Sequence, residues 1–170
     1  KINNKNHIIS SSIEHKAVLD PLEQIKKMGI QVTYIQPSTS GHIQAKQILD
    51  EITSKTFLVS CMHANNETGV LQDIKAIAKI ARSAGALLHI DAIQALSKVP
   101  IDFMLLGVDM MSISSHKIGG PQGVGALIVQ EKLPIKSFIF GGGQEIGRRG
   151  GTENIAGIVG FGRAVSMIKK

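Results

Sequence analysis

Short apolar runs that alternate with helical patterns are the feature that most constrains how this chain folds. Each run is rich in β-branched and apolar residues and is bounded by turn-forming residues, as strands are. Strands that are apolar on both faces predict an α/β fold of three layers, in which helices cover both faces of a mostly parallel sheet. A length of 170 residues suits one such unit rather than two. The expected strands are 7–12, 31–36, 56–62, 86–90, 109–114 and 124–129, and the expected helices are 17–28, 45–53 and 73–83.

The ends of two expected helices carry residues that start or stop helices. Gly29 and Gly85 follow the last apolar positions of helices 17–28 and 73–83, as helix-terminating glycines do. Asp73 is the candidate N-cap of the second of these helices. Pro21 is expected in the first turn of helix 17–28, where proline is tolerated.

Polar side chains follow several expected strands at the points where those strands end. The carboxyl ends of parallel strands meet at one edge of a sheet, and ligands bind at that edge. We therefore expect a ligand site assembled from segments that are distant in the sequence. Its candidates are His15, Asn65, Asn66, Asp91, Gln94, Ser114, Ser115, His116 and Lys117.

Asp91 and Lys117 each allow two interpretations. Asp91 comes directly after the apolar strand 86–90, and it suits either the N-cap of a helix that begins at Ala92 or the counter-ion of a positively charged ligand nitrogen. Lys117 stands between a strand and a glycine-containing turn. Its amine is a nucleophile able to form a Schiff base if it is partly removed from water, and otherwise it is a solvated surface group.

Glycine is concentrated in the carboxyl-terminal third, where 13 of the 18 glycines lie between Gly119 and Gly162. Glycines allow backbone N–H groups to approach phosphate oxygens, and nearby Arg148, Arg149 and Thr152 add donors. Residues 141–145 and 148–152 are therefore candidate anion cradles, although plain surface loops have the same composition. Neither segment fits the P-loop pattern.

Composition excludes several classes of function. The formal net charge is +6, but the basic residues are scattered and no basic stripe with interleaved aromatics predicts direct nucleic-acid binding. The single cysteine, Cys61, excludes an internal disulfide framework and a cysteine-rich metal site, and we expect a buried, inert thiol. No metal-ligand spacing, membrane-length apolar run or secretory signal is visible, so a cytoplasmic enzyme without a metal is expected.

Five segments carry a combined pattern: SIEHKAV at 12–18, HANNETG at 63–69, HIDAIQ at 89–94, SSHK at 114–117 and RRGGTEN at 148–154. Together and in this order they resemble the cysteine desulfurases, which are pyridoxal-phosphate enzymes of the class V aminotransferase group. The resemblance covers essentially the whole chain. The GGGQE and GTEN stretches look most like the nitrogen-fixation-type branch of that family. The resemblance implies the large domain of the fold type I transferases.

The resemblance implies a role for each matching residue. Lys117 matches the Schiff-base lysine, and Asp91 matches the acid that keeps the pyridine nitrogen protonated. His15 matches the imidazole that stacks on the ring face and shuttles protons. The other cofactor-binding matches are Asn66 and Gln94 around the ring hydroxyl and substrate, Ser114 and His116 at the phosphate, and Thr152, a phosphate ligand that reaches in from the partner subunit.

The implied reaction removes sulfur from L-cysteine and gives L-alanine and an enzyme persulfide. That sulfur would serve iron–sulfur cluster assembly and tRNA thiolation. The implied partners are the L-cysteine substrate, a second copy in a homodimer, and iron–sulfur scaffold or sulfur-acceptor proteins. Neither direct nucleic-acid binding nor a membrane is implied.

The chain also departs from the family's pattern. Ser115 replaces the glycine of the usual Ser-Gly-His-Lys, and Gln122 stands where lysine is common. The family's amino-terminal segment, and the small domain that carries the persulfide cysteine and a substrate-carboxylate arginine, have no match here. We therefore expect residues 1–170 to be the central part of an incomplete large domain that is inactive alone. Cys61 does not occupy the persulfide position.

Two other functions remain open at this point. Selenocysteine lyases share most of these motifs and differ in the loop that is not matched here. A truncated remnant without catalytic activity would act only as a binding or dimerisation module.

Overall fold

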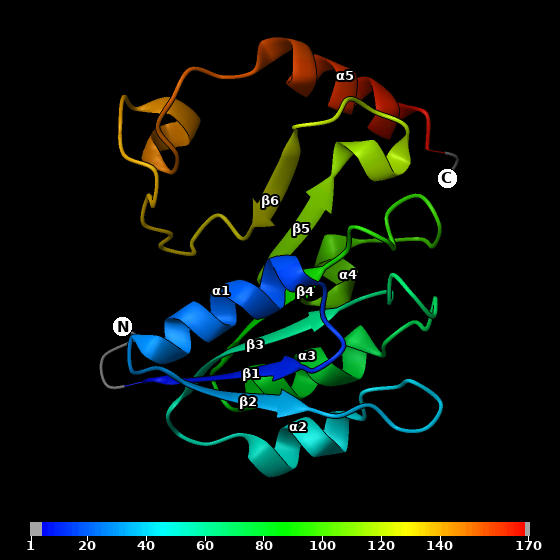
Figure 1. Ribbon diagram of the computed structural model, residues 1–170, viewed down its shortest axis with the longest axis vertical. Coiled ribbons are helices and arrows are strands. Elements are labelled where there is room, and N and C mark those ends of the chain that lie inside the picture. The colour runs from blue at the N-terminus through cyan, green and yellow to red at the C-terminus, as the bar shows by residue number, and fades with distance from the viewer. Residues whose placement is uncertain (1–4, 169–170) are drawn as a thin grey trace.

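A computed structural model describes residues 5–168 as a six-stranded sheet with helices on both faces (Figure 1). The strand order is β2-β1-β3-β4-β5-β6. Neighbouring strands from β2 to β5 are parallel, and only β6 at the edge runs antiparallel to β5. The predicted mostly parallel α/β sheet is therefore confirmed. The strands are β1 (His7–Ser11), β2 (Gln31–Ile35), β3 (Thr56–Met62), β4 (Leu87–Asp91), β5 (Met110–Ser114) and β6 (Gly125–Val129).

Helices follow most of the strands and cover the two faces of the sheet. In Figure 1, α1 lies on one face and α2 and α3 on the other. Within residues 5–168, no helix is long and apolar enough to cross a bilayer. The helices are α1 (Lys16–Lys27), α2 (Ala45–Glu51), α3 (Ile74–Ser83), α4 (Phe103–Leu106) and α5 (Ile155–Ser166), with 3₁₀ turns η1 (Ser115–Ile118) and η2 (Gln144–Gly147).

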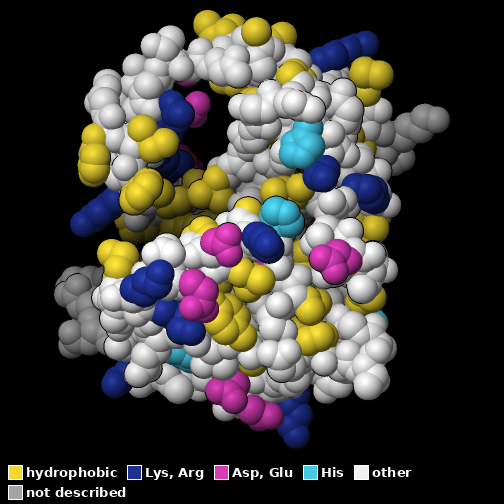
Figure 2. Space-filling view, in the orientation of Figure 1, with side chains coloured by type: hydrophobic (Ala, Val, Ile, Leu, Met, Phe, Trp, Pro, Cys, Tyr) yellow, Lys and Arg dark blue, Asp and Glu magenta, His cyan; other side chains and the backbone are white. Residues whose placement is uncertain are grey.

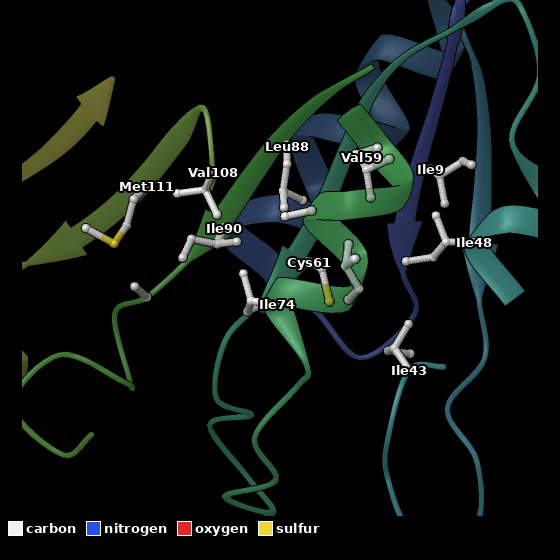
Figure 3. Packing of buried hydrophobic residues seen from close by; sticks show 14 of the residues in the cluster. Ile9, Ile43, Ile48, Val59, Cys61, Ile74, Leu88, Ile90, Val108 and Met111 are labelled. Carbon is white, nitrogen blue, oxygen red and sulfur yellow. The ribbon is translucent and has the colours of Figure 1, made fainter. Parts of the chain in front are cut away.

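The main hydrophobic core lies between the sheet and helices α2 and α3 (Figure 3). Alternate residues of each strand point to the same face, so Ile9, Val59 and Ile90 all face this core. Ile77 of α3 and Ile48 of α2 meet them, and each is at most 1% exposed. Burying an isoleucine side chain contributes about 1.5 to 3 kcal/mol, so this layer holds the carboxyl ends of the strands in place.

The opposite face of the sheet carries a polar row between its central strands. His89 of β4 lies with Nδ1 2.9 Å from Ser60 Oγ of β3 and with Nε2 2.8 Å from Ser112 Oγ of β5. Burial lowers the pKa of His89 to about 4, so its ring is neutral near pH 7. His89 is thus a structural histidine with both ring nitrogens in hydrogen-bond contact.

The sequence-based predictions for the starts of α3 and α1 have different outcomes. Asp73 caps α3 as predicted, since its side chain accepts a hydrogen bond from the Ala76 N–H at 3.0 Å. The prediction that Pro21 lies in the first turn of α1 is wrong, because the helix begins at Lys16 and the proline falls in the second turn. Proline has no N–H, so the hydrogen bond that residue 21 would donate to the Ala17 carbonyl is lost.

Residues 130–168, here called the C-terminal arm, arch away from the sheet and return as α5 (Figure 1). Phe138, Phe140 and Ile146 of the arm are 93%, 87% and 92% exposed. Figure 2 shows the arm around a deep hollow with hydrophobic side chains at its rim. The arm is thus the least packed part of the molecule.

Candidate functional site

A cavity of about 410 Å³ lies at the carboxyl ends of the parallel strands. It is lined by residues at and just after the ends of β1, β3, β4 and β5. Two neighbouring hollows of about 450 and 550 Å³ share Asn66 with it. Six of the eight residues to which the family resemblance gives a role line the cavity: His15, Asn66, Asp91, Gln94, His116 and Lys117.

His15 is fixed by the start of helix α1. It is the N-cap residue, and its Nδ1 accepts a hydrogen bond from the Ala17 N–H at 3.1 Å. Because Nδ1 is the acceptor, the neutral ring carries its proton on Nε2. The cap therefore sets both the orientation of the imidazole and the atom with which it donates.

Asp91 is the buried acid of the cavity, with 6% of its surface exposed. Its Oδ1 accepts a hydrogen bond from the Ile93 N–H at 2.9 Å. Residues 93–98 form turns rather than a helix, so the interpretation of Asp91 as the cap of a helix beginning at Ala92 is wrong. Burial raises the pKa of Asp91, and the hydrogen bond from the Ile93 N–H opposes that rise. A positively charged group in the cavity would stabilise the carboxylate.

The two asparagines after β3 have different tasks. Asn65 is buried, and its Oδ1 accepts hydrogen bonds from the Glu67 N–H at 3.0 Å and the Thr68 N–H at 2.8 Å. These bonds shape the loop that places Asn66 in the cavity wall. Asn65 is thus structural, and Asn66 is the residue available to a ligand.

Gln94 reaches the cavity from the turn after β4. Its side-chain Oε1 and its backbone carbonyl both accept hydrogen bonds from Lys98 Nζ, at 3.2 and 2.9 Å. The lysine therefore occupies the amide oxygen and leaves the Nε2 hydrogens as the donors that Gln94 can offer.

Residues 114–117 form the junction of β5 and η1. Ser114 Oγ lies 2.8 Å from His116 Nδ1, which places the serine next to a cavity residue although it does not line the cavity itself. Lys117 is exposed and lines the cavity. Its amine is thus accessible to a ligand, and burial by this chain alone does not remove it from water.

Ser115, which replaces the family's usual glycine, has room for its side chain because residue 120 beside it is a glycine. Its side chain is fully buried, and a Cβ atom at Gly120 would collide with Ser115 Oγ and lie 3.1 Å from Ala164 Cβ. The glycine at 120 therefore provides the space that the serine hydroxyl fills.

The glycine-rich segments of the arm bond to one another. The Gly150 N–H donates to the Ile139 carbonyl at 2.7 Å, and the Gly151 N–H donates to Gln144 Oε1 at 3.2 Å. These two donors are used within the chain and are not free to cradle an anion. Thr152 is exposed on the arm and does not line the cavity, so its role stays a prediction.

Glu14 is a buried acid to which the sequence analysis assigned no role. It is 5% exposed, and its Oε1 accepts hydrogen bonds from Ser11 Oγ and, at 2.7 Å, from the Met62 N–H. Burial raises its pKa to about 7, with a further contribution from the charge of Asp91. The signal that was available is its place next to His15 at the end of a strand.

Comparison with known proteins agrees with this geometry. The profile of the aminotransferase class-V family matches residues 1–170. The cysteine desulfurase IscS of Shewanella denitrificans is 47% identical over 166 residues, which are 96% of this chain and 41% of that protein. The IscS of Proteus mirabilis is 45% identical over the same shares. The chain therefore spans less than half the length of these relatives.

Solved structures match the fold closely. SspA in complex with cysteine superimposes with a TM-score of 0.95 and 42% identity over 99% of this chain and 49% of that chain. DndA from Streptomyces lividans superimposes with a TM-score of 0.89 and 42% identity over 96% of this chain and 48% of that chain.

Proposed function

This chain belongs to the aminotransferase class-V family, and we propose from that premise that its protein is a pyridoxal-phosphate-dependent cysteine desulfurase. Residues 1–170 would form the central part of the cofactor-binding large domain. The observation that carries the proposal is the convergence of a buried acid, a primary amine, two imidazoles and two amides on one cavity. The similarity to cysteine desulfurases over 96% of the chain supports it.

The donor set of the cavity suits pyridoxal phosphate. Asp91 is a buried carboxylate that needs a cationic partner, and the ring nitrogen of the cofactor becomes one when protonated. Lys117 offers an accessible amine for the aldehyde, and Asn66 and Gln94 offer amides for the ring hydroxyl. When bound, the cofactor supplies an electron sink that stabilises negative charge on the substrate carbon.

Each residue of this chain would have a defined task. Asp91 would hold a proton on the ring nitrogen, and Lys117 would bind the cofactor covalently through its amine. His15 would lie against the ring and donate from Nε2, because its Nδ1 already accepts the Ala17 N–H. Ser114 and His116, which are in contact, would bind phosphate together.

We assign the substrate and partners by analogy with the relatives. L-cysteine is the proposed substrate, since the relatives are cysteine desulfurases and SspA is solved in complex with cysteine. Thr152 lies on the exposed arm, and we propose that it binds phosphate in the site of a second copy within a homodimer. Iron–sulfur scaffold or sulfur-acceptor proteins would receive the sulfur.

Cofactor binding is the direct test of the site. Titration of the protein with pyridoxal phosphate should produce the visible absorption band of the lysine-bound cofactor. Lys117→Ala should abolish the band, whereas Lys79→Ala, on the exposed side of α3, should leave it unchanged. A band that persists in Lys117→Ala would refute the assignment of the lysine.

Product analysis tests the reaction. The protein in its full length should release alanine and transfer sulfur when supplied with L-cysteine and a thiol reductant. Faster turnover of selenocysteine than of cysteine would instead identify a selenocysteine lyase.

A further inference from the structure

We propose that Glu14 is a positioning residue of the cofactor site, which ties the turn carrying His15 to the end of β3 beside Asp91 and is neutral in the state that binds the cofactor, so that the negative charge rests on Asp91. This inference rests on the proposed function and assigns to it a residue that does not line the cavity. It follows from the hydrogen bonds, the burial and the neighbours of the Glu14 carboxyl.

The hydrogen bonds of Glu14 join two strand ends. Oε1 accepts from Ser11 Oγ at the end of β1 and from the Met62 N–H at the end of β3. Met62 lines the cavity and is the register partner of Asp91 in the β3–β4 pair. A shift of the Glu14 carboxyl would therefore move His15, the next residue, relative to the strand end that carries Asp91.

A second bond holds the same turn independently. Asn65 Nδ2 donates to the Ile13 carbonyl at 3.0 Å. Because this bond does not involve Glu14, the turn keeps one attachment when the carboxyl is replaced. Substitution should then change the position of His15 without removing the turn from the fold.

The surroundings of the second carboxyl oxygen of Glu14, Oε2, favour the neutral form of the side chain. Among residues 5–168, Oε2 is buried and has no hydrogen-bond partner. A buried oxygen without a donor is far more costly as part of an anion than as part of a neutral acid. The raised pKa of Glu14, about 7, agrees with this geometry.

The groups that face Glu14 also disfavour a second negative charge. Asp91 on β4 is an acid, and the Cys61 thiol on β3 is fully buried, with a pKa raised first by burial and then by Glu14. His15 at the start of α1 is the neighbouring basic group, with its Nδ1 already accepting the Ala17 N–H. Ionisation of Glu14 would thus place two like charges on one wall of the site.

Three variants test the proposal. Glu14→Gln keeps a carbonyl oxygen for Ser11 and Met62 and cannot ionise. Glu14→Ala removes the attachment. Glu131→Gln removes an exposed carboxylate of the arm and serves as the matched control. The readouts are the dissociation constant of pyridoxal phosphate, from the visible absorption band, and its pH dependence.

The proposal predicts a specific pattern of affinities. Glu14→Gln should bind as tightly as the wild type below pH 6, and Glu14→Ala should bind about tenfold more weakly, as expected for a lost hydrogen bond to the backbone. Between pH 6 and 8.5 the wild type should weaken several-fold relative to Glu14→Gln. The ratio of the wild-type dissociation constant to that of Glu14→Gln is taken at each pH, because it cancels the titration of groups common to both proteins.

The outcomes separate this inference from the proposed function. A ratio that stays flat from pH 6 to 8.5, or a Glu14→Gln variant as weak as Glu14→Ala, would overturn the role of Glu14 alone. A wild type that forms no lysine-bound band would overturn the proposed function, and the role of Glu14 with it.

Discussion

The sheet with its helices and the C-terminal arm differ sharply in how they bury apolar side chains. Ile9, Ile77 and Ile90 in the sheet layers are 0% exposed, whereas Phe138 and Ile146 in the arm are 93% and 92% exposed. The six cavity residues all belong to the packed part, and Thr152 belongs to the arm. The comparison shows that the sheet positions its half of the site by internal packing, whereas residues of the arm depend on what the arm contacts.

The largest expected contrast is between one core residue and one arm residue. Ile90→Ala should lower the free energy of unfolding by about 3 to 4 kcal/mol, because it leaves a cavity in a close-packed layer. Phe138→Ala should change it by less than about 0.5 kcal/mol, because the ring is already in water. Urea denaturation of both variants measures the difference, and equal losses would contradict it.

Adding a methyl group at one glycine of the packed region and at one glycine of the arm should also have different effects on stability. Gly120→Ala should cost about 1 to 3 kcal/mol, because its Cβ would collide with the buried Ser115 hydroxyl. Gly143→Ala in the arm should cost little, since no atom of residues 5–168 lies within 4 Å of its Cβ position. Both are measured by thermal unfolding.

A double variant checks the cause of this loss. Ser115→Gly combined with Gly120→Ala should recover part of the stability, because the colliding oxygen is removed. Failure to recover any stability would show that the serine hydroxyl is not the obstacle.

Two buried groups of the sheet region should give opposite pH dependences of stability. Glu14 has a folded pKa of about 7 against an ordinary 4.5, so its contribution is complete below pH 4.5 and is lost as pH rises to 7. His89 has a folded pKa of about 4 against 6.5, so its contribution is complete above pH 6.5 and is lost as pH falls. Between pH 4.5 and 6.5 the two slopes oppose each other.

Replacing Glu14 or His89 alone should reveal the pH dependence of the unfolding free energy that the other group causes. Glu14→Gln should lose stability on acidification from pH 6.5 to 5, by about 1 kcal/mol per pH unit, because the histidine slope is no longer balanced. His89→Asn should instead lose stability as pH rises from 5 to 7. Unfolding free energies at several pH values test both, and the same slope in both variants would refute the assignment.

The smallest contrast should appear for interactions that are local. Asp73 caps α3 in the packed region, and Asn154 caps α5 in the arm through a hydrogen bond from the Gly157 N–H at 3.1 Å. Alanine at either position should cost about 1 kcal/mol, because a cap bond depends on its own helix. A much larger loss at either position, seen by chemical denaturation, would show that the cap also supports tertiary contacts.

Prediction from sequence succeeded where local pattern decides structure. The strand 56–62 was predicted with the bounds that β3 has, because its apolar run is nearly continuous and the flanking residues, Lys55 and His63, are polar. Asp73 was likewise predicted correctly as the N-cap of α3. One of the two interpretations of Asp91 required a helix after it, and that helix does not form, although the Asp91 carboxyl makes a cap-like bond to the Ile93 N–H. One favourable side-chain bond therefore did not decide the backbone conformation of that segment.

The site residues likewise divide into those that local sequence pattern predicts and those that it does not. Asp91, Lys117 and His15 were identified from their places after strands and from the family pattern, and the cavity brings them together. Glu14 was not identified, because its principal bond joins residues 48 positions apart. Nothing near Glu14 in the sequence indicates that Met62 will donate to it.

The sequence by itself determined the layers of this protein, the order along the chain of its six strands and of helices α1 to α3, and the chemical types at the strand ends. Those features follow from periodicity, turn residues and capping, which act over a few positions. Only the tertiary structure decided which polar side chains share a cavity, which acid is deprived of water, and which apolar residues stay exposed. Burial and desolvation depend on atoms supplied by distant segments, and the raised pKa of Glu14 and the exposed ring of Phe138 are their consequences.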